Sequence, residues 1–415
     1  MADFEVHIDL HGRTRPVGLA RSNRVRGAEI ILFEYDGAWL EDPDRFSLEP
    51  ALSLTRGAFA PPAGLETFGS IGDSAPDTWG RRLMQRAERR LAAREGRAVR
   101  ALAQSDYLLG VADETRLGSL RFRRLGEETF QAPTRVGVPA LIELARLLQI
   151  TERILRDEET YEDLQLIFAP GSSLGGARPK ASVIDQHGRL AIAKFPKETD
   201  DYSMETWEEI ALRLADQAGI ATPRHELVDV AGKAVLLSQR FDRNGAIRIP
   251  FLSAMAMMGA RDGERGSYPE MVDALAEHGA QGKKDAQALY RRVVFHVLIS
   301  NVDDHLRNHG FLWRGKAGWS LSPAYDLNPT PFDLKARVLT TNIDLDEGTC
   351  SLDLLEKASA YFALTLAQAR SIIKEVATVT ATWRDTAKAV RARPAEINRM
   401  ASAFEHDDLR RALAL

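Results

Sequence analysis

The chain has 415 residues, 44% hydrophobic and 27% charged, an ordinary globular composition that suits two or three structural units of about 100–200 residues each. Its 55 basic and 59 acidic residues leave a net charge of −4, which argues against a whole-surface nucleic-acid binder. The single cysteine, Cys350, excludes an intrachain disulfide and a cysteine-built zinc site. The sequence shows neither a signal peptide nor an apolar run of about 20 residues, so we expect a cytoplasmic protein without a membrane span.

Strand patterns open the chain. Residues 4–10 alternate apolar and polar side chains, as a half-buried strand does. Residues 30–35 form a second strand candidate, and the Asp36-Gly37 pair that follows is typical of a hairpin turn. We therefore expect a small β-rich subdomain at the start of the chain.

Residues 78–104 have the pattern of a helix that is rich in arginine. The arginines are Arg81, Arg82, Arg86, Arg89, Arg90, Arg94, Arg97 and Arg100. They are compatible with a phosphate-binding surface or with a solvated helix face. We favour the solvated face, because basic runs match many ordinary protein surfaces.

The composition breaks near residues 131–134, and three kinds of segment follow. The pattern predicts a helix over 139–155, a glycine-rich segment at 171–176, strands at 181–184, 190–193 and 234–237, and a helix over 204–218 that Gly219 ends. Helical patterns prevail after residue 251, including 354–362 and 366–379. These boundaries divide the chain into a β-rich part (1–135), a mixed α/β lobe (136–244) and a mostly helical lobe (245–415).

A polar cluster follows an apolar helix near residue 298. Asp303 and Asn308 are five residues apart, the spacing of the kinase catalytic loop D-x-x-x-x-N. A short loop of this kind aims a carboxylate at the attacking hydroxyl and turns back so that an amide oxygen reaches Mg²⁺. Asp304 competes for the role of base, but its spacing fits less well, and the motif alone does not distinguish a catalytic loop from a capped, solvated one.

The segment after this loop favours the catalytic interpretation. Residues 309–313 and 319–321 have strand patterns with a glycine-containing turn between them, and Asp326 follows the second strand. Kinases place a second acidic metal ligand at the end of such a hairpin. Asn308 and Asp326 would supply the hard oxygen ligands that Mg²⁺ prefers. The alternative for Asp326 is an Asx-turn, which we consider the weaker interpretation.

Upstream, residues 190–194 resemble the kinase strand V-A-I-K, whose lysine contacts the α- and β-phosphates. Lys194 is that lysine. Glu205, Glu208 and Glu209 lie on the next predicted helix and could each pair with Lys194 or simply form a solvated helix face. Among them we select Glu208.

The glycine-rich segment precedes Lys194. Gly175, Gly176 and Ala177 would let backbone N–H groups approach phosphate oxygens, and Lys180 would add charge. The segment matches neither standard phosphate-loop motif, and a surface turn is the alternative. His296, inside an apolar helix, is expected to be a core histidine.

Taken together, these motifs resemble the HipA-type serine/threonine kinases of bacterial toxin–antitoxin modules. The matching stretches are FGSIGDSAPDTWGRRL (68–83), SSLGGARPK (172–180), AKFP (193–196), QRFDR (239–243), NVDDHLRN (301–308) and SPAYD (322–326). The resemblance covers nearly the whole chain, although the family commonly has a glutamate where Gln239 and Pro179 stand.

The resemblance implies an α+β fold with a protein-kinase-like two-lobe core, consisting of a mixed α/β nucleotide lobe and a mostly helical C-terminal lobe, after a small β-rich N-terminal subdomain. It also implies ATP and Mg²⁺ as cofactors, with Asp303 as the base that accepts the substrate hydroxyl proton. Asn308 and Asp326 would hold the metal, and Lys194 the ATP phosphates. Gln239 and Phe241 would lie beside adenine, and His305 would also be near the nucleotide.

The family further implies self-inactivation and partners. Ser173 corresponds to the serine that such kinases autophosphorylate, with Ser172 as the neighbouring candidate. Targets in the family are typically aminoacyl-tRNA synthetases, and a small helix-turn-helix antitoxin usually binds the kinase, which meets DNA only through that complex. A small-molecule kinase and an inactive, kinase-like co-repressor are the alternatives that the sequence leaves open.

Overall fold

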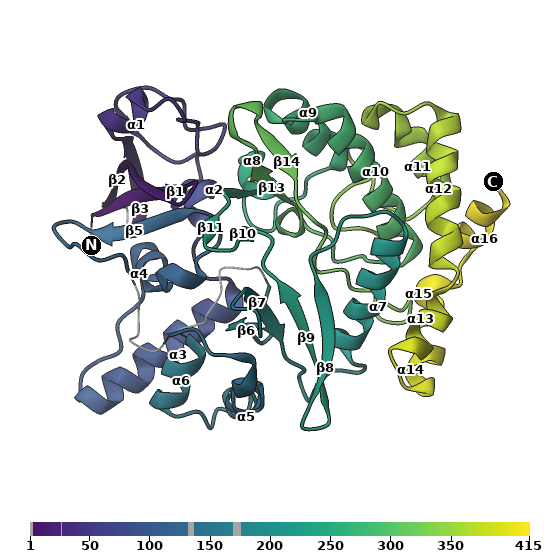
Figure 1. Ribbon diagram of the computed structural model, residues 1–415, viewed down its shortest axis with the longest axis horizontal. Coiled ribbons are helices and arrows are strands. Elements are labelled where there is room, and N and C mark those ends of the chain that lie inside the picture. The colour runs from purple at the N-terminus through teal and green to yellow at the C-terminus, as the bar shows by residue number, and fades with distance from the viewer. Residues whose placement is uncertain (1–2, 26, 132–136, 169–175) are drawn as a thin grey trace. The chain divides into compact units, whose positions relative to one another are not determined.

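The computed structural model describes residues 3–25, 27–131, 137–168 and 176–415 (Figure 1). Ser172, Ser173 and Gly175 lie outside the described residues. The chain forms two compact units: unit 1 comprises residues 1–198 and 228–261, and unit 2 comprises residues 199–227 and 262–415. The three-part division drawn from the sequence stays a prediction.

Unit 1 begins with an antiparallel sheet in the order β4-β3-β2-β1-β5. Its strands are β1 (Phe4–Leu10), β2 (Arg13–Val25), β3 (Ala28–Tyr35), β4 (Ala58–Phe59) and β5 (Leu120–Arg124). The strands expected at 4–10 and 30–35 are therefore confirmed. The hairpin expected at Asp36-Gly37 is wrong, because the Asp36 carboxylate accepts a hydrogen bond from the Ala38 N–H (2.7 Å) and caps the short helix α1 (Gly37–Glu41).

The arginine-rich helix is shorter than the sequence pattern predicts. Helix α3 (Thr78–Glu95) ends where Gly96 takes a left-handed conformation, φ 63°, which glycine adopts without steric cost. Helix α4 (Gln104–Gly110) is a separate element. The expectation of one helix over 78–104 is thus wrong in its last turns, where Gly96 stops the helix.

The second sheet of unit 1 has the order β6-β7-β9-β8. Its strands are β6 (Lys180–Ile184), β7 (Leu190–Lys194), β9 (Lys233–Gln239) and β8 (His225–Val230), of which only the last residues belong to unit 1. Helices α3, α5 (Leu144–Leu155) and α6 (Tyr161–Phe168) lie beside it (Figure 1). Leu83, Leu147, Leu164 and Val183 belong to one buried cluster, so helices and sheet share a core.

Shorter elements complete unit 1. They are α2 (Gly69–Gly72), η1 (Asp113–Thr115), η2 (Leu141–Glu143), β10 (Arg243–Asn244), β11 (Ile247–Arg248), β12 (Phe251–Ser253) and α8 (Ala254–Met257). The predicted helix over 139–155 is confirmed from residue 144 onward, since its start is the 3₁₀ turn η2.

Unit 2 is mostly helical. Its helices are α7 (Met204–Gln217), α9 (Tyr268–His278), α10 (Gly282–Leu298), α11 (Leu352–Ala358), α12 (Leu366–Thr380), α13 (Trp383–Ala389), α14 (Pro394–Arg399), α15 (Ala401–Phe404) and α16 (Asp407–Ala414), with the 3₁₀ turns η3 (Leu306–Asn308), η4 (Gly315–Ala317) and η5 (Ser359–Phe362). Buried aromatic rings join three of them: Trp383 stacks on Phe404, with centroids 4.6 Å apart, and lies 6.1 Å from Trp207.

One hairpin interrupts these helices at the point that the sequence predicts. Strands β13 (Gly310–Trp313) and β14 (Trp319–Leu321) pair antiparallel, with Leu312 opposite Ser320. The hairpin begins directly after η3 and returns the chain toward Asp326. None of the helices in the described part of the chain has the length and apolar character needed to span a bilayer.

Candidate active site

The polar cluster of unit 2 lies where α10 ends. Ser300 takes a left-handed conformation, φ 53°, which reverses the chain after the helix. Its Oγ donates to the Ala403 carbonyl (2.8 Å) and accepts from Arg337 Nε (3.0 Å). The Ser300 carbonyl accepts from the Thr330 N–H (3.1 Å). The loop is therefore fixed at its first residue by contacts to distant parts of the unit.

Asp303 and Asp304 are adjacent in the loop and have opposite environments. The Asp303 side chain is 66% exposed, and its carboxylate contacts Lys335 Nζ at 3.1 Å. Asp304 has no exposed surface. Only Asp303 can present its carboxylate to a substrate in solvent, which supports its selection over Asp304 as the base.

The buried carboxylate and the backbone carbonyl of Asp304 hold the loop in place through hydrogen bonds. Its Oδ2 accepts from the Tyr268 hydroxyl and lies 2.7 Å from His309 Nε2. Its backbone carbonyl accepts from the Thr341 N–H (3.0 Å) and the Thr341 hydroxyl (2.7 Å). Burial opposes the charged form, but the neighbouring histidines and the Tyr268 hydroxyl outweigh it, so that the pKa of Asp304 lies well below its usual range.

Asn308 closes the loop. Its Nδ2 donates to the Asp303 carbonyl (3.3 Å), and its side chain is nearly buried. This bond engages the amide nitrogen with the loop backbone, so that Oδ1 is the amide atom that could accept a metal ion. His305 lies in the same turn, where its carbonyl accepts from the Asn308 N–H (2.8 Å).

The hairpin brings Asp326 back to this loop. Asp326 has a left-handed backbone, φ 58°, a conformation that aspartate tolerates better than most residues. Its Oδ1 accepts from Asn328 Nδ2 (3.2 Å), and the Asn328 N–H donates to Asn301 Oδ1 (3.0 Å). The Tyr325 hydroxyl donates to the Arg307 carbonyl (2.7 Å). Asp303, His305, Asn308 and Asp326 are thus connected within unit 2.

The donor set suits a magnesium ion. The described residues contain no cluster of three or more histidine, cysteine, aspartate or glutamate side chains. Mg²⁺ does not require one, because it is commonly held by one or two carboxylates with waters and substrate phosphates. One amide oxygen from Asn308 and one carboxylate from Asp326 fit that pattern.

The other predicted ligands lie in unit 1, apart from Glu208. Lys194 ends β7, where it pairs with Lys180 on β6 and Leu236 on β9. Gln239 lies opposite Ala191, and the Phe241 ring is 6.3 Å from that of Phe251.

Glu208 is buried on α7, in unit 2. Its neighbour Glu209 pairs with Arg213 (2.6 Å) and His225 (2.7 Å). A pair between Glu208 and Lys194 stays a prediction, as do the roles assigned to all these residues.

The end of the glycine-rich segment is held by a motif that the sequence did not link to it. Lys180 is 3% exposed, and its Nζ contacts Asp77 Oδ2 at 2.9 Å. Trp79 donates through Nε1 to the Lys180 carbonyl (3.0 Å) and through its N–H to the Gly176 carbonyl (3.3 Å). A Cβ added to Gly176, φ 96°, would lie 3.1 Å from Lys180 Nζ. Ala177 beside it is exposed.

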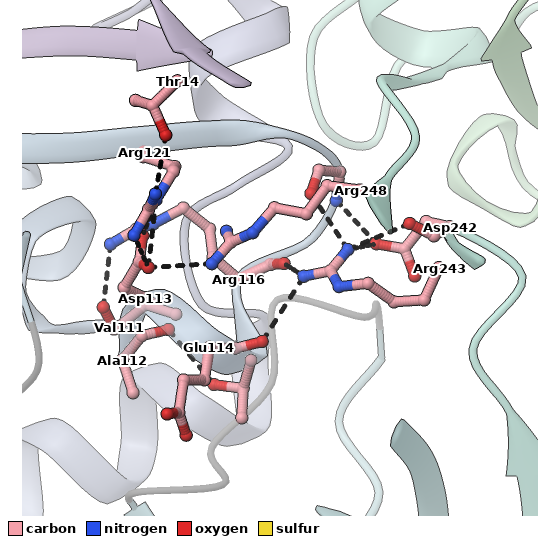
Figure 2. A network of polar contacts seen from close by, with 12 residues as sticks. Thr14, Val111, Ala112, Asp113, Glu114, Arg116, Arg121, Asp242, Arg243 and Arg248 are labelled. Carbon is pink, nitrogen blue, oxygen red and sulfur yellow. Dashed lines mark hydrogen bonds and ion pairs between the residues drawn. The ribbon is translucent and has the colours of Figure 1, made fainter. Parts of the chain in front are cut away.

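The motif at 239–243 forms a buried charge network with residues near 113–118 (Figure 2). Arg240 and Arg243 both contact the Asp242 carboxylate, at 2.5 and 2.6 Å, and the Gly118 N–H donates to it (2.7 Å). Burial opposes ionisation, but the two arginines outweigh it and lower the pKa of Asp242 to about 2. This network joins the segment after β9 to the segment before β5.

The arginines of α3 are largely engaged within unit 1. Arg86 pairs with Asp157 (2.5 Å) and Glu159 (3.1 Å). Arg94 lies over the Tyr161 ring at 4.7 Å, and Arg90 pairs with Glu159 (3.4 Å). These contacts support the solvated, ion-paired interpretation of the helix over a phosphate-binding surface.

Comparisons with known proteins identify the family of this chain. The model of the HipA-like C-terminal domain matches residues 172–383, more than half of the chain. "Putative kinase" of Haemophilus influenzae is 24% identical over 182 residues, 38% of this chain and 52% of that protein. "Putative kinase Y4dM" of Sinorhizobium fredii is 30% identical over 156 residues, 34% of this chain and 37% of that protein. The chain therefore spans about half, or less, of the curated relatives that it matches.

A solved structure shares the fold over almost the whole chain. It is HipA of Shewanella oneidensis MR-1, from a toxin–antitoxin complex with HipB and operator DNA, with a TM-score of 0.64 and 16% identity. The likeness covers 99% of this chain and 96% of that one. The predicted α+β, kinase-like fold with its β-rich N-terminal part is thereby confirmed.

Proposed function

The chain belongs to the family of the HipA-like C-terminal domain, and on that premise we propose that it is an ATP-dependent serine/threonine-protein kinase acting as a toxin. The observation that carries the proposal is the arrangement within unit 2. An exposed carboxylate, Asp303, lies on the same short loop as Asn308, and hydrogen bonds tie that loop to the segment of Asp326. Base, amide and acid occur in the order of a kinase site.

Each residue has a defined task in this reaction. Asp303 accepts the proton of a substrate serine hydroxyl as its oxygen attacks the γ-phosphorus of ATP. Exposed ion pairs such as Lys335–Asp303 contribute little stability, so a substrate hydroxyl can replace the ammonium. Asn308 Oδ1 and the Asp326 carboxylate would hold Mg²⁺, which neutralises phosphate charge when bound. Lys194 would contact the ATP phosphates.

Label transfer from ATP tests this function. With γ-labelled ATP and Mg²⁺, we expect the purified chain to label itself on the peptide that contains Ser172 and Ser173, and Asp303→Asn to abolish the label. Asp353→Asn is a matched control, because Asp353 is a 72% exposed aspartate of the same unit paired with Arg411, and it should leave labelling intact.

Three outcomes would contradict the proposal. Transfer only to small hydroxyl compounds would indicate a small-molecule kinase. Neither transfer nor ATP binding would indicate an inactive co-repressor. Equal labelling by the Asp303→Asn variant would remove Asp303 as the base.

The substrate and partners follow from the same proposal. We expect an aminoacyl-tRNA synthetase as the protein target and a small helix-turn-helix antitoxin as the partner, through which the kinase would meet DNA. Phosphorylation assays on individual purified synthetases, with the Asp303→Asn variant as control, test the target. Labelling of none of them would contradict that part of the proposal while leaving the self-labelling result unaffected.

A further inference from the structure

Asn301 is a buried residue of unit 2 to which no role has yet been assigned. It lies two residues before Asp303 and is 1% exposed. Its Oδ1 accepts from the Asn328 N–H (3.0 Å), and its Nδ2 is 2.8 Å from His296 Nδ1. One side chain therefore contacts both the end of α10 and the segment that follows Asp326.

The backbone contact determines the orientation of the Asn301 amide. An N–H group can only donate, so the atom that faces Asn328 must be the amide oxygen. The amide nitrogen then faces His296 and donates to Nδ1, which places the imidazole proton on Nε2. Burial lowers the pKa of His296 to about 4, so a neutral ring near pH 7 agrees with this geometry. The Asn301 N–H also donates to the His296 carbonyl (2.9 Å).

The other end of the contact fixes a strained segment. Asp326 has a positive φ of 58°, and such conformations persist only where the surroundings hold them. Asn328 supplies that support through its side chain and its backbone. Its Nδ2 donates to Asp326 Oδ1, and its N–H donates to Asn301 Oδ1. Next to it, the Tyr202 hydroxyl donates to the Pro329 carbonyl (3.3 Å).

We propose that Asn301 is a positioning residue that holds the Asp326 segment at a fixed place relative to the Asp303 loop. It touches neither substrate nor reacting atoms, and it acts through Asn328 on Asp326. The inference rests on the proposed kinase function in one respect, which is that Asp326 acts as a metal ligand. The contact between Asn301 and Asn328 is independent of that function.

Two variants separate the parts of this contact. Asn301→Leu keeps the number and branching of the side-chain heavy atoms and removes both side-chain hydrogen bonds. Asn301→Asp retains an oxygen that accepts from the Asn328 N–H and loses the donor to His296. Asn342→Leu is the matched control, because Asn342 is another nearly buried asparagine of unit 2, and its Nδ2 donates to the Leu345 carbonyl (3.3 Å).

Hydrogen exchange of the Asn328 amide in the metal-free protein tests the contact directly. We expect slow exchange in the wild type and in Asn301→Asp, and fast exchange in folded Asn301→Leu. Fast exchange in the wild type, or equal protection in Asn301→Leu, would overturn the inference whatever the chain catalyses. If Asn301→Leu does not fold, Asn301→Ala, which also lacks the acceptor oxygen, takes its place in the comparison with Asn301→Asp.

Binding of Mn²⁺ with ADP, followed by electron paramagnetic resonance, tests the consequence for the site. We expect Asn301→Leu to weaken Mn²⁺ binding about 10- to 100-fold, as loss of a ligand's supporting contact does. Asn301→Asp should bind more tightly than Asn301→Leu, and Asn342→Leu should match the wild type. In kinetics, the KM for the complex of ATP with Mg²⁺ should rise, because metal and nucleotide bind together and weaker binding of one weakens binding of the other.

A double variant distinguishes a failure of this inference from a failure of the proposed kinase function. If Asn301 acts through Asp326, Asn301→Leu should weaken Mn²⁺ binding no further in an Asp326→Asn background. Additive effects would overturn the inference and leave Asp326 as a ligand. If the wild type binds no Mn²⁺ with ADP, or Asp326→Asn binds it normally, the proposed metal site fails, and the effect of Asn301 on it fails as well.

Discussion

Asp77 and Lys180 form a buried ion pair, with Asp77 Oδ2 and Lys180 Nζ 2.9 Å apart and both side chains less than 5% exposed. The same carboxylate caps α3, since its Oδ1 accepts from the Gly80 N–H (2.7 Å). One aspartate therefore fixes the first turn of a helix and the first residue of β6. Because β6 directly follows the glycine-rich segment, the pair anchors the end of that segment in unit 1.

Removing one residue of this ion pair should lower the stability of unit 1. We expect Lys180→Met to lower the stability of unit 1 by about 3–5 kcal/mol, because it leaves the Asp77 carboxylate buried without its partner. Asp77→Ser with Lys180→Met should regain most of that loss, since serine also caps helices and no buried charge remains. Hydrogen exchange along β6 gives the measurement. A double variant less stable than Lys180→Met would contradict this account.

The adjacent aspartates of the loop should respond differently to the same substitution. Asp303→Asn should change the free energy of unfolding by less than about 1 kcal/mol, because its carboxylate has an exposed ion pair, while phosphate transfer is lost. Asp304→Asn should cost about 2 kcal/mol or more, because it removes the charge from a buried hydrogen-bonded group. Urea denaturation and the label-transfer assay measure both. An unstable Asp303→Asn or a stable Asp304→Asn would reverse our assignment of their roles.

The stability of unit 2 should fall as the pH is lowered from about 6.5 to 4. Burial lowers the pKa of His296 and of His406 to about 4, below the value of about 6.5 for an unfolded histidine. The unfolded state then binds protons that the folded state does not. Each histidine contributes about 1.4 kcal/mol per pH unit within this window. Urea denaturation between pH 7 and 4.5 gives the slope, which His406→Gln should roughly halve.

Glu49 in unit 1 should show the opposite pH dependence. Burial raises the pKa of Glu49 to about 7, although the Ser70 N–H donates to its carboxylate. A carboxyl group whose pKa is higher in the folded than in the unfolded state stabilises the fold at pH values below its unfolded pKa. That contribution to stability is lost as the pH rises to 7. Lowering the pH from 7 to about 4.5 should therefore strengthen the Glu49 contribution in unit 1, and Glu49→Gln should abolish that trend. A fall in unit 1 stability that Glu49→Gln leaves unchanged would contradict the Glu49 assignment, and a rise in unit 2 stability would contradict the assignment of the histidines.

The charge network around Asp242 should stabilise the folded conformation of residues 113–118. Arg240→Met leaves Asp242 with Arg243 and the Gly118 N–H, and we expect it to cost about 3–5 kcal/mol. Arg21→Met is a suitable control, since Arg21 forms an exposed pair with Glu34 at 3.5 Å and should cost less than about 1 kcal/mol. Hydrogen exchange at Gly118 measures the effect, and unchanged protection in Arg240→Met would contradict it.

Local patterns predicted much of the fold and the central loop. The alternation at 4–10 and the hairpin at 309–321 were visible because each depends on neighbouring residues. At Asp36 two local rules conflicted, since aspartate before glycine favours both a hairpin turn and a helix cap. The packing of the following residues decided for the cap, and the sequence does not show that packing.

Contacts between distant residues could not be predicted. Asp77 and Lys180 are separated by 103 positions, and neither residue type nor spacing reveals the pair. Asn301 and Asn328 are 27 positions apart, and their contact depends on a left-handed Asp326. Spacing did select Asp303 over Asp304, but only burial explains why the second aspartate is present. The contact of Lys180 with phosphate stays a prediction, and its buried contact with Asp77 could not be predicted from the sequence.

The division of the chain into units has a consequence for its synthesis. Unit 1 is completed only when residues 228–261 have been made, and Asp242 must emerge from the ribosome before the Gly118 N–H has its partner. Trp207 on α7 is translated earlier still, and more than 170 positions separate it from its aromatic neighbours Trp383 and Phe404. Until these later residues emerge, the nascent chain exposes the apolar surface that they cover in the folded protein, and such surface favours aggregation.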